Sequence, residues 1–415
     1  MSKIGVIGGG IVGLSSAYYL NKTGHQVTIM DQSDLKDGCS FGNAGMIVPS
    51  HIIPLAAPGM ISKGIRWMFN SQSPFYVKPR LNGDLIKWGY HFYRSSTKEH
   101  VAKSAPALKN LSFFSKEMYQ QLAKDLPFNF GYHERGLLML YKSKEAEHEE
   151  TEMAKFANQQ GVEAQILSAN EIQKMEPDVR VDVRGGIYFP GDAHLTPGKL
   201  VPLLINYLKE QGVKFQPNTT VNDFVIEQEK IKTIKINTGD LSFDEVVLAT
   251  GSWSGLVGAR LGLLLPMQAG KGYSFTLVDV EKNIQIPSIF LEARVAVTPM
   301  GTSLRFGGTM EITGIDHGIS MNRVKGIVDS IPKYYPDMSV AVPDVKDVWH
   351  GLRPCSPDGL PYIGRSAKIK NLTIATGHSM MGLSQGPGTG KLVSEIINQK
   401  NTSIGLSEFS PERFD

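Results

Sequence analysis

The first 31 residues alternate between continuous apolar runs and helical apolar spacing. An apolar run over residues 3–7 predicts a strand, the spacing over residues 14–20 predicts a helix, and residues 26–30 predict a second strand. Elements in this order form a βαβ unit with parallel strands. A helix over residues 198–210, preceded by a threonine cap and a proline, and a strand over residues 213–215 add to the same pattern.

The rest of the pattern is mixed and predicts a second region of a different kind. Two or three helices are expected over residues 84–124, where apolar positions recur at helical spacing. The other expected elements are a strand over 136–141, an amphipathic helix over 144–160, a strand over 162–167, a hairpin over 219–236, a buried strand over 245–251, strand-like runs over 273–278 and 303–306, and a helix over 322–335.

The turn after the first strand carries the glycine pattern of a dinucleotide site. Gly8 permits a tight turn, Gly10 lets the backbone approach a pyrophosphate, and Gly13 allows close packing of helix on strand. The following helix directs its N-terminus at the phosphate charge. Asp31 ends the second strand, where a carboxylate accepts hydrogen bonds from an adenosine ribose. We therefore expect dinucleotide binding rather than a plain glycine turn.

This unit alone does not distinguish FAD from NAD. A buried strand that ends on Ala249, Thr250 and Gly251 favours FAD, because such an ending is a common second contact of FAD-binding folds with the dinucleotide. The loop over residues 37–46 consists of small and polar residues. It is either an ordinary surface turn or a segment whose backbone amides approach a second phosphate or a flavin ring.

A chain of 415 residues is too long for one ordinary core, so two domains are expected. The fold class that we predict is α/β with an α+β second domain. A Rossmann-like FAD-binding domain combines three segments, and a discontinuous antiparallel-sheet substrate domain combines two. The first comprises residues 1–48, 191–266 and 345–415, and the second comprises residues 49–190 and 267–344.

Composition excludes several classes of function. Lys and Arg exceed Asp and Glu by only 3, and no basic cluster is present, so nucleic acid is not an expected partner. Cys39 and Cys355 lie far apart without metal-ligand spacing, which argues against a disulfide framework and a metal site and favours a reducing cytoplasm. No run reaches the ~18 to 20 apolar residues of a membrane span. Because the glycine motif begins so early, we expect no signal peptide.

Two further features have alternative interpretations. The segment over residues 47–70 is apolar and carries Lys63, Arg66 and Trp67, so it is either a lid or core segment or a peripheral contact with a membrane surface. His194 lies beside Asp192, as in a catalytic dyad. No nucleophile is close in the sequence, and a loop role is therefore favoured.

Five motifs in one order resemble a known family. They occupy residues 40–46, 54–59, 271–274, 348–364 and 376–382. The longest reads Val348-Trp349-His350-Gly351-Leu352-Arg353-Pro354-Cys355-Ser356-Pro357-Asp358-Gly359-Leu360-Pro361-Tyr362-Ile363-Gly364. Together they resemble the FAD-dependent D-amino acid dehydrogenases, relatives of D-amino acid oxidase and glycine oxidase, over the whole chain.

The resemblance implies catalytic roles for Arg353, Tyr273 and His378. Arg353 would pair bidentately with the substrate carboxylate, which suits a planar guanidinium between Gly351 and Pro354, although a structural salt bridge is the alternative. Tyr273 resembles a substrate-pocket tyrosine or is a packing residue. His378 belongs to a segment that resembles the flavin-edge loop or is a plain capped turn.

The motifs and the resemblance together imply a set of FAD contacts: Gly8, Gly10, Ile11, Val12, Gly13, Asp31, Gln32, Ser40, Asn43, Ala44, Gly45, Met46, Val221, Ala249, Thr250, Gly251, Gly377, His378, Met381, Gly382, Leu383 and Ser384. Some relatives bind flavin covalently through a cysteine seven positions before the aspartate of the Asp-Gly element. Gly351 stands there and Cys355 lies only three positions before Asp358, so we expect non-covalent FAD.

The resemblance implies oxidative deamination of D-amino acids to 2-oxo acids through an imino acid, by hydride transfer to flavin. Electrons would pass to a quinone or another acceptor, in the cytoplasm or at the inner face of the membrane. One alternative is an oxidase or dehydrogenase of secondary amino acids such as D-proline, cis-4-hydroxy-D-proline or sarcosine, or of glycine. Another is a non-catalytic flavin-binding assembly protein, which the presence of Arg353 disfavours.

Overall fold

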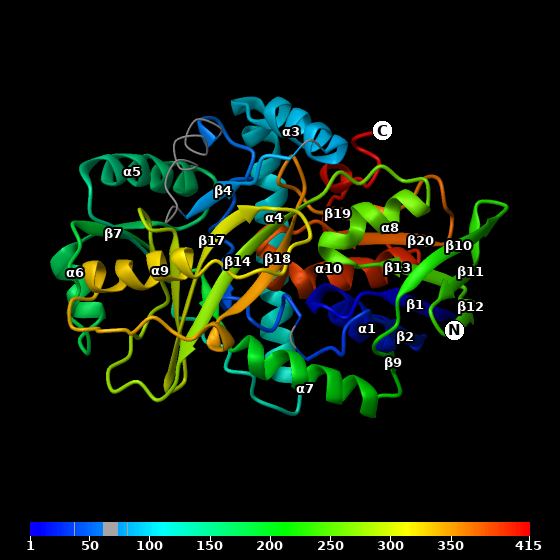
Figure 1. The fold of residues 1–415 in the computed structure, drawn as a ribbon, viewed down its shortest axis with the longest axis horizontal. Coiled ribbons are helices and arrows are strands. Elements are labelled where there is room, and N and C mark those ends of the chain that lie inside the picture. The colour runs from blue at the N-terminus through cyan, green and yellow to red at the C-terminus, as the bar shows by residue number, and fades with distance from the viewer. Residues whose placement is uncertain (37, 61–73, 81) are drawn as a thin grey trace.

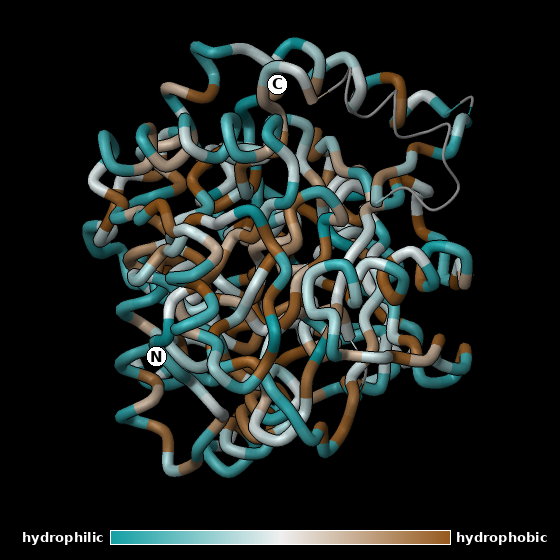
Figure 2. The backbone as a smooth tube through the Cα atoms, turned by 90° about the vertical axis from the view of Figure 1, so that its left-hand side faces the viewer, coloured by the Kyte–Doolittle hydropathy of each residue, from teal (hydrophilic) through white to brown (hydrophobic). Residues whose placement is uncertain are grey.

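The computed structural model describes residues 1–36, 38–60, 74–80 and 82–415. Two large sheets lie side by side, with helices on their outer faces (Figure 1). Hydrophobic segments run through the middle of the molecule, whereas hydrophilic segments occupy many of its outer loops (Figure 2). No helix in the described ranges has both the length and the hydropathy of a membrane span.

The first sheet is parallel apart from one edge strand and has the order β19-β20-β13-β1-β2-β9. Each pairing in it except β19 with β20 is parallel, as the βαβ pattern predicted. Its strands are β1 (Lys3–Ile7), β2 (Gln26–Met30), β9 (Lys214–Gln216), β13 (Glu245–Leu248), β19 (Tyr362–Arg365) and β20 (Leu372–Thr376).

One face of this sheet is covered by a bundle of helices. The bundle and the sheet share a core that includes Leu14, Tyr119, Leu204 and Val393. The helices are α1 (Ile11–Lys22), α4 (Lys98–Asp125), α7 (Pro197–Glu210) and α10 (Gly382–Ile397). A Cβ atom on Gly390 of α10 would lie 2.4 Å from the backbone of Ser15, so this glycine lets α10 and α1 touch directly.

The other face of the first sheet is covered by a small sheet and a short helix, which share a second core with it. The small sheet contains the predicted hairpin, and its pairings are antiparallel. These elements are β10 (Val221–Glu227), β11 (Lys230–Ile236), β12 (Gly239–Leu241) and α8 (Ser254–Arg260).

The second sheet is mixed and mostly antiparallel, with the order β18-β14-β17-β16-β15-β5-β7-β6 and β4 beside β17. Its two parallel pairings are β15 with β5 and β4 with β17. The strands are β4 (Phe75–Val77), β5 (Leu137–Tyr141), β6 (Gln165–Ser168), β7 (Gly185–Phe189), β14 (Gln268–Leu277), β15 (Ser288–Phe290), β16 (Val295–Met300), β17 (Ser303–Ile312) and β18 (Trp349–Cys355).

Helix α9 packs on one face of the second sheet, where Val324 and Ile327 join the core around Phe306. The remaining helices of this region are α3 (Gly83–Ser95), α5 (Lys144–Gln159), α6 (Ala169–Met175) and α9 (Met321–Tyr334). A pair of two-residue strands, β3 (Met46–Ile47) and β8 (Ala193–His194), lies in the segments where the chain passes between the two regions.

Most predicted elements are present close to their expected bounds. The βαβ unit is confirmed, and residues 84–124 form two helices, α3 and α4. Helix α7 begins at Pro197 as predicted, but the Thr196 hydroxyl makes no capping hydrogen bond within the described structure. Of the segment over residues 47–70, the part from 61 onward, with Lys63, Arg66 and Trp67, lies outside the described residues.

One strand lies in a different region from the one expected. We expected residues 345–415 in the FAD-binding domain, but β18 pairs with β14 in the second sheet over seven residue positions. The chain turns after β18 and enters the first sheet only at β19, so the backbone groups of β18 are paired by β14 of the second sheet. We propose a domain boundary after Cys355 in place of residue 345.

Candidate active site

The glycine motif forms a cradle at the N-terminus of α1. Gly8 has φ +108°, and a Cβ there would lie 2.3 Å from the carbonyl oxygen of Ala249. A Cβ on Gly13 would lie 1.9 Å from the Gly8 oxygen, so both positions exclude a side chain. At Gly10 the nearest atom to such a Cβ is Ser40 Oγ at 3.6 Å, which leaves space at the helix N-terminus. A pyrophosphate fits this space.

Asp31 is held beside this cradle by backbone and side-chain donors. The Gly9 amide donates to its Oδ2 (2.6 Å), while the amide and hydroxyl of Ser33 donate to its Oδ1 (2.8 and 2.7 Å). The carboxylate is therefore fixed at the end of β2, where the sequence predicted a ribose contact. Gln32 is exposed beside it. The Ile11 amide donates to Ser40 Oγ (2.9 Å), and Val12 is half-buried next to it.

The loop after β2 is clamped onto the second sheet. Arg305 on β17 donates from Nη1 to the carbonyl oxygens of Phe41 (3.1 Å) and Asn43 (2.9 Å), and Ser274 Oγ on β14 donates to that of Gly42 (2.8 Å). Burial lowers the pKa of Arg305 to about 10. Arg305, which the sequence analysis did not single out, holds this loop against the sheet that carries Arg353. We call the loop over residues 40–46 the flavin loop, because the sequence analysis expects it to contact the flavin.

The end of β13 and the start of β10 lie near the cradle. The Ala249 amide donates to the Ile7 oxygen (2.8 Å), and Thr250 Oγ1 lies 2.9 Å from Ser254 Oγ. Gly251 has φ +53° and begins a short 3-10 turn. The Val221 carbonyl accepts a hydrogen bond from Arg260 Nη1 (2.6 Å). The expected contacts from three separate segments are thus brought to one edge of the first sheet.

The segment after β20 is sharply turned before α10 begins. Gly377 and the non-glycine Ser379 both have positive φ, +80° and +49°. His378 is buried, and its Nε2 lies 2.9 Å from Thr389 Oγ1 within α10. Burial lowers the pKa of His378 to about 3, so the imidazole is neutral near pH 7. It braces the turn and has no charge to offer at neutral pH.

The start of α10 joins this turn to the chain that follows the flavin loop. Gly382 is the first residue of the helix, and Met381 precedes it. The Leu383 carbonyl accepts from Tyr119 Oη (2.7 Å), and Ser384 Oγ accepts from the Val48 amide (3.0 Å). The chain directly after residues 44–46 and the segment over residues 376–384 are therefore in contact.

Arg353 lies on the face of the second sheet that meets the flavin loop. Its Nη1 donates to the Thr309 carbonyl oxygen (2.6 Å), and a Cβ on Gly272 would lie 2.2 Å from both terminal nitrogens. The guanidinium therefore extends from β18 across β14 to β17. Within the described part of the chain no carboxylate forms an ion pair with it, and burial lowers its pKa. The salt-bridge alternative has no partner there.

A bulge in the sheet provides the oxygen that holds this arginine. The register of β14 with β17 shifts between Lys271 and Tyr273, and Thr309 on the bulged strand has φ +66°. Bulges redirect backbone groups near functional sites. With one nitrogen engaged by the Thr309 carbonyl, the guanidinium keeps further N–H donors for an anion of carboxylate geometry.

Glycines on the sheet around Arg353 leave space for side chains that lie flat over its surface. Gly272 pairs with Gly351, and a Cβ built on Gly307 would lie 3.8 Å from Ala44 Cβ of the flavin loop. The Trp349 ring occupies the space above two glycines, since a Cβ on Gly42 or on Gly351 would lie 2.0 Å from it. A cavity of about 570 Å³ adjoins this ring and is lined by Phe41, Ser274, Arg305 and Trp349 among others.

Tyr273 points to the opposite face of β14. Alternate residues of a strand face opposite sides, and Ser274 faces the flavin loop. The Tyr273 ring is 1% exposed and packs in the core beneath α9, where its hydroxyl accepts a hydrogen bond from the Ser320 amide (3.1 Å). This position corresponds to the packing role that the sequence left open, and it does not place the ring beside Arg353.

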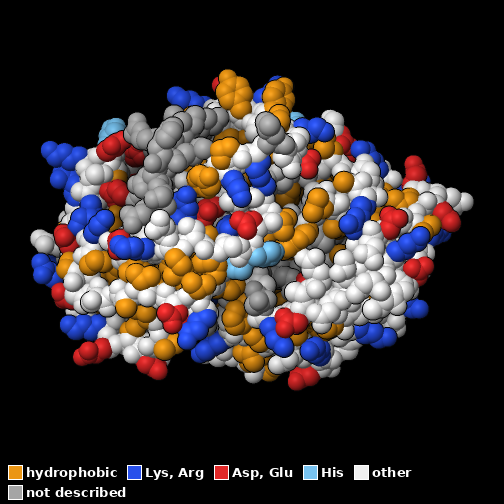
Figure 3. Space-filling model, in the orientation of Figure 1, with side chains coloured by type: hydrophobic (Ala, Val, Ile, Leu, Met, Phe, Trp, Pro, Cys, Tyr) orange, Lys and Arg blue, Asp and Glu red, His pale blue; other side chains and the backbone are white. Residues whose placement is uncertain are grey.

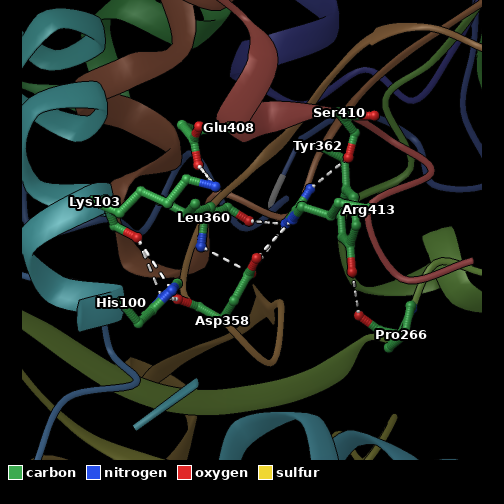
Figure 4. Close-up of polar contacts among 10 residues, drawn as sticks. His100, Lys103, Pro266, Asp358, Leu360, Tyr362, Glu408, Ser410 and Arg413 are labelled. Atoms are coloured by element: carbon green, nitrogen blue, oxygen red, sulfur yellow. Dashed lines mark hydrogen bonds and ion pairs between the residues drawn. The ribbon is translucent and has the colours of Figure 1, made fainter. Parts of the chain in front are cut away.

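The Asp358–Gly359 turn is an anchor for the strand that carries Arg353. Arg413 forks onto the Asp358 carboxylate (Nε to Oδ2 2.6 Å, Nη2 to Oδ1 3.0 Å) and lies 4.0 Å from the centre of the Tyr362 ring (Figure 4). His100 Nε2 contacts the Asp358 carbonyl at 2.8 Å. Gly359 has φ +79°, and a Cβ there would lie 2.6 Å from the Leu55 amide nitrogen. The turn therefore ties the C-terminus, α4 and the chain around residue 55 to β18.

His194 and Asp192 do not form a dyad with each other. Asp192 is buried and accepts hydrogen bonds from the Ser50 amide (3.0 Å) and hydroxyl (2.5 Å), whereas the His194 ring lies beside His133, with centroids 5.3 Å apart. These contacts are structural, in agreement with the loop role that the sequence analysis favoured for His194. Among the described residues, no group of three or more His, Cys, Asp or Glu side chains is arranged to hold a metal ion.

Comparison with known proteins defines the class to which this site belongs. The profile of the DAO family, described as FAD dependent oxidoreductase, matches residues 3–396. The chain belongs to this family of FAD-dependent oxidoreductases, and FAD is its cofactor. The glycine cradle and the fixed Asp31 are consistent with that cofactor because they leave space for a pyrophosphate and present a carboxylate to a ribose.

Two curated relatives with the same name match nearly the whole chain. The chain is 31% identical over 426 residues to a D-amino acid dehydrogenase of Granulibacter bethesdensis, with 99% of each chain covered. It is also 31% identical to a D-amino acid dehydrogenase of Helicobacter pylori, over 97% of this chain and 98% of the relative.

Solved structures show the same fold. The glycine oxidase from Geobacillus kaustophilus superposes with a TM-score of 0.78 at 23% identity, with all of both chains covered. The L-proline dehydrogenase from P. horikoshii gives 0.75 at 22% identity, with 100% of this chain and 97% of the other covered.

Proposed function

We propose that this chain oxidises D-amino acids to 2-oxo acids through an imino acid and passes the electrons to a quinone-type acceptor. The observation that carries the proposal is the Arg353 guanidinium, a half-buried cation that donates to a carbonyl oxygen and has no carboxylate partner among the described residues. Such a group favours an anionic ligand, because a partly desolvated charge without a counter-charge is costly. The relatives named D-amino acid dehydrogenase support the substrate class.

In the proposed reaction, Arg353 holds the substrate carboxylate through two parallel N–H donors. The Thr309 carbonyl fixes the guanidinium plane, and Gly272 leaves the space that the guanidinium needs to lie over the sheet. Bound FAD supplies the redox chemistry by accepting a hydride from the substrate Cα. The protein's own contribution is orientation, and well-aligned geometry lowers barriers by up to roughly 7 to 11 kcal/mol in model reactions.

No acid–base pair is needed from the protein in this scheme. His378 was expected among the catalytic residues, but its ring is neutral and engaged with Thr389, so we propose a positioning role at the flavin-edge turn. The substrate amine reacts in its neutral form after losing a proton to water. For a primary amine, water then hydrolyses the imino acid to the 2-oxo acid and ammonia.

We propose that FAD is held without a covalent bond. Cys355 is completely buried in a cluster with Trp88, Met310 and Ile312, and burial raises the pKa of its thiol to about 11. A thiol that is buried and protonated is a poor nucleophile. The resemblance described in the sequence analysis implies a cysteine for covalent attachment seven positions before Asp358, where this chain has Gly351.

Turnover with a panel of substrates tests the proposal. Purified protein is supplied with D- and L-alanine, D-proline, cis-4-hydroxy-D-proline, glycine and sarcosine, with a soluble quinone or with oxygen as acceptor. We expect D-isomers to be oxidised with the quinone, and primary amines to yield ammonia and a 2-oxo acid. Exclusive oxidation of L-isomers would refute the stereochemical proposal, and preference for oxygen would refute the acceptor. Activity confined to secondary amines would select that alternative substrate class.

A further inference from the structure

Helix α3 presents an apolar stripe to solvent. Ile86, Tyr90 and Tyr93 are 63%, 56% and 70% exposed. Their spacing of four and three residues puts all three on one side of the helix. Hydrophobic side chains project from the edge of the molecule where α3 lies in Figure 1 (Figure 3). Contiguous exposed apolar patches of this kind mark interaction sites.

The opposite side of α3 is fully engaged with the protein. Trp88 is buried, stacks on Phe92 with ring centroids 5.0 Å apart and donates from Nε1 to the Cys355 carbonyl oxygen (2.8 Å). The His91 ring contacts Phe414 at the C-terminus (4.9 Å between centroids). These contacts fix the rotation of the helix, so the outward stripe is a stable feature of the fold.

Cations lie along one edge of the stripe. Lys87 and Arg94 are both exposed, and the Arg94 guanidinium lies 5.9 Å from the centre of the Tyr90 ring. At 100° per residue they follow Tyr90 around the helix. Residues 75–95 contain four Lys and Arg and one Asp, an excess of 3. The segment that includes α3 is therefore locally basic.

Helix α3 is connected to the strand that carries Arg353 by a side-chain hydrogen bond. The Trp88 indole bonds to Cys355, which lies two residues beyond Arg353 on β18. A partner bound to the outer face of α3 would therefore lie close to Cys355, the last residue of β18.

We propose that the outer face of α3, formed by Ile86, Tyr90 and Tyr93 with Lys87 and Arg94 along its edge, docks on the surface of a bilayer that contains anionic lipids. Tyrosine and aliphatic side chains suit the interfacial layer, and Lys and Arg are attracted to anionic headgroups. The proposal rests on the proposed function in one respect, that a lipid-soluble quinone would be met at this surface. Membrane contact by the segment over residues 47–70 was one of two alternatives in the sequence analysis, and its part from residue 61 onward lies outside the described residues.

Vesicle co-sedimentation of the FAD-loaded protein, without substrate, tests the proposal. Phosphatidylcholine vesicles with and without phosphatidylglycerol are compared at low and high salt. We expect at least about tenfold stronger binding to the anionic vesicles at low salt and loss of that preference at high salt. Binding that is absent, or equal on both vesicle types, would overturn the proposal.

Two variants and a matched control assign the effect to α3. Ile86→Ser/Tyr90→Ser/Tyr93→Ser should weaken binding by about tenfold or more, and Lys87→Gln/Arg94→Gln should remove the preference for anionic lipid. The control, Ile166→Ser/Leu256→Ser, changes two residues that are 51% and 55% exposed on β6 and α8 and should bind as wild type does. Equal binding by all four proteins would place the contact elsewhere.

Sedimentation without vesicles tests the competing occupant, a second copy of the chain. If wild type is a dimer and the triple variant a monomer, the stripe is a protein interface and the membrane proposal falls. Turnover of D-amino acids with a soluble dye is measured in parallel and should be the same for all variants. If wild type shows no such turnover, the proposed function is refuted. The vesicle measurement then still tests the docking surface, because it uses no substrate.

Discussion

Replacing Arg353 with lysine separates recognition of the carboxylate from cofactor binding. The lysine keeps the positive charge but cannot present two parallel donors, and it also loses the contact that fixes the guanidinium to the Thr309 carbonyl at 2.6 Å. One charge-assisted hydrogen bond contributes about 1.5 to 3 kcal/mol. Losing one bond to the substrate therefore predicts a rise in KM of about 10- to 150-fold, since 1.4 kcal/mol corresponds to tenfold.

The assay combines steady-state kinetics on a D-amino acid with FAD content per protein. Arg353→Lys should have full FAD content and a raised KM, because the guanidinium lies on the second sheet and the phosphate cradle on the first. A matched control is Arg365→Lys on β19, where the arginine pairs with Glu245 instead of facing the site. Gly272→Ala should reproduce the KM effect, because its Cβ would lie 2.2 Å from the Arg353 nitrogens.

The reasoning would be refuted if Arg353→Lys kept the wild-type KM with full FAD content. The same conclusion would follow if Arg365→Lys raised KM as much as Arg353→Lys, since the effect would then be one of general stability. Loss of FAD from Arg353→Lys but not from Arg365→Lys would indicate that the second sheet and the cofactor are coupled more tightly than the contacts around Arg353 imply.

Three further predictions concern the cofactor and its surroundings. Arg305→Gln should weaken FAD binding by about tenfold or more, measured by flavin fluorescence, because two hydrogen bonds from Nη1 to the flavin loop are lost; unchanged affinity would remove the clamp from the account. Acid precipitation should release all FAD, and Cys355→Ser should leave FAD content unchanged; flavin retained on the pellet would contradict the non-covalent assignment. Because burial lowers the pKa of His378 to about 3, the unfolded chain binds the proton first, and the free energy of unfolding should fall by up to about 1.4 kcal/mol per pH unit from about pH 6 to 4 on its account. Denaturant titrations of His378→Asn should show a slope against pH that is shallower by that amount, whereas an unchanged slope would mean that the folded protein protonates this ring.

The parts of the fold that sequence predicted are those with local signals. The βαβ unit follows from a glycine turn between two apolar runs, and α7 begins at Pro197 because proline fits the first turn of a helix. The hairpin predicted over residues 219–236 is present as β10 and β11, whose two strands follow each other directly in the chain. Such elements are specified by residues that are close together in the sequence.

The parts that sequence missed depend on contacts between distant segments. Arg305 bonds to Phe41 across 264 positions, and the bulge at Thr309 exists only because β14 and β17 pair with a shifted register. Trp349 gains its position from Gly42 and Gly351, which meet in space and not in sequence. No periodicity or motif in one segment encodes these relations.

Tyr273 illustrates a different limit. In its motif, Lys271-Gly272-Tyr273-Ser274, Gly272 lies under Arg353 and Ser274 donates to the Gly42 carbonyl oxygen. The alternation of strand residues sends the tyrosine between them into the core beneath α9. The face of each residue is set by strand pairing, which the motif alone does not reveal.

The measurement that tests the central claim most directly is the absorbance of the bound flavin under anaerobic conditions as D- and L-isomers of the same amino acid are added in turn. The account predicts that the D-isomer bleaches the flavin, that the L-isomer does not, and that Arg353→Lys needs a higher D-isomer concentration for the same rate. Bleaching by the L-isomer alone would contradict the account. So would folded, FAD-loaded protein that no amino acid of the panel bleaches.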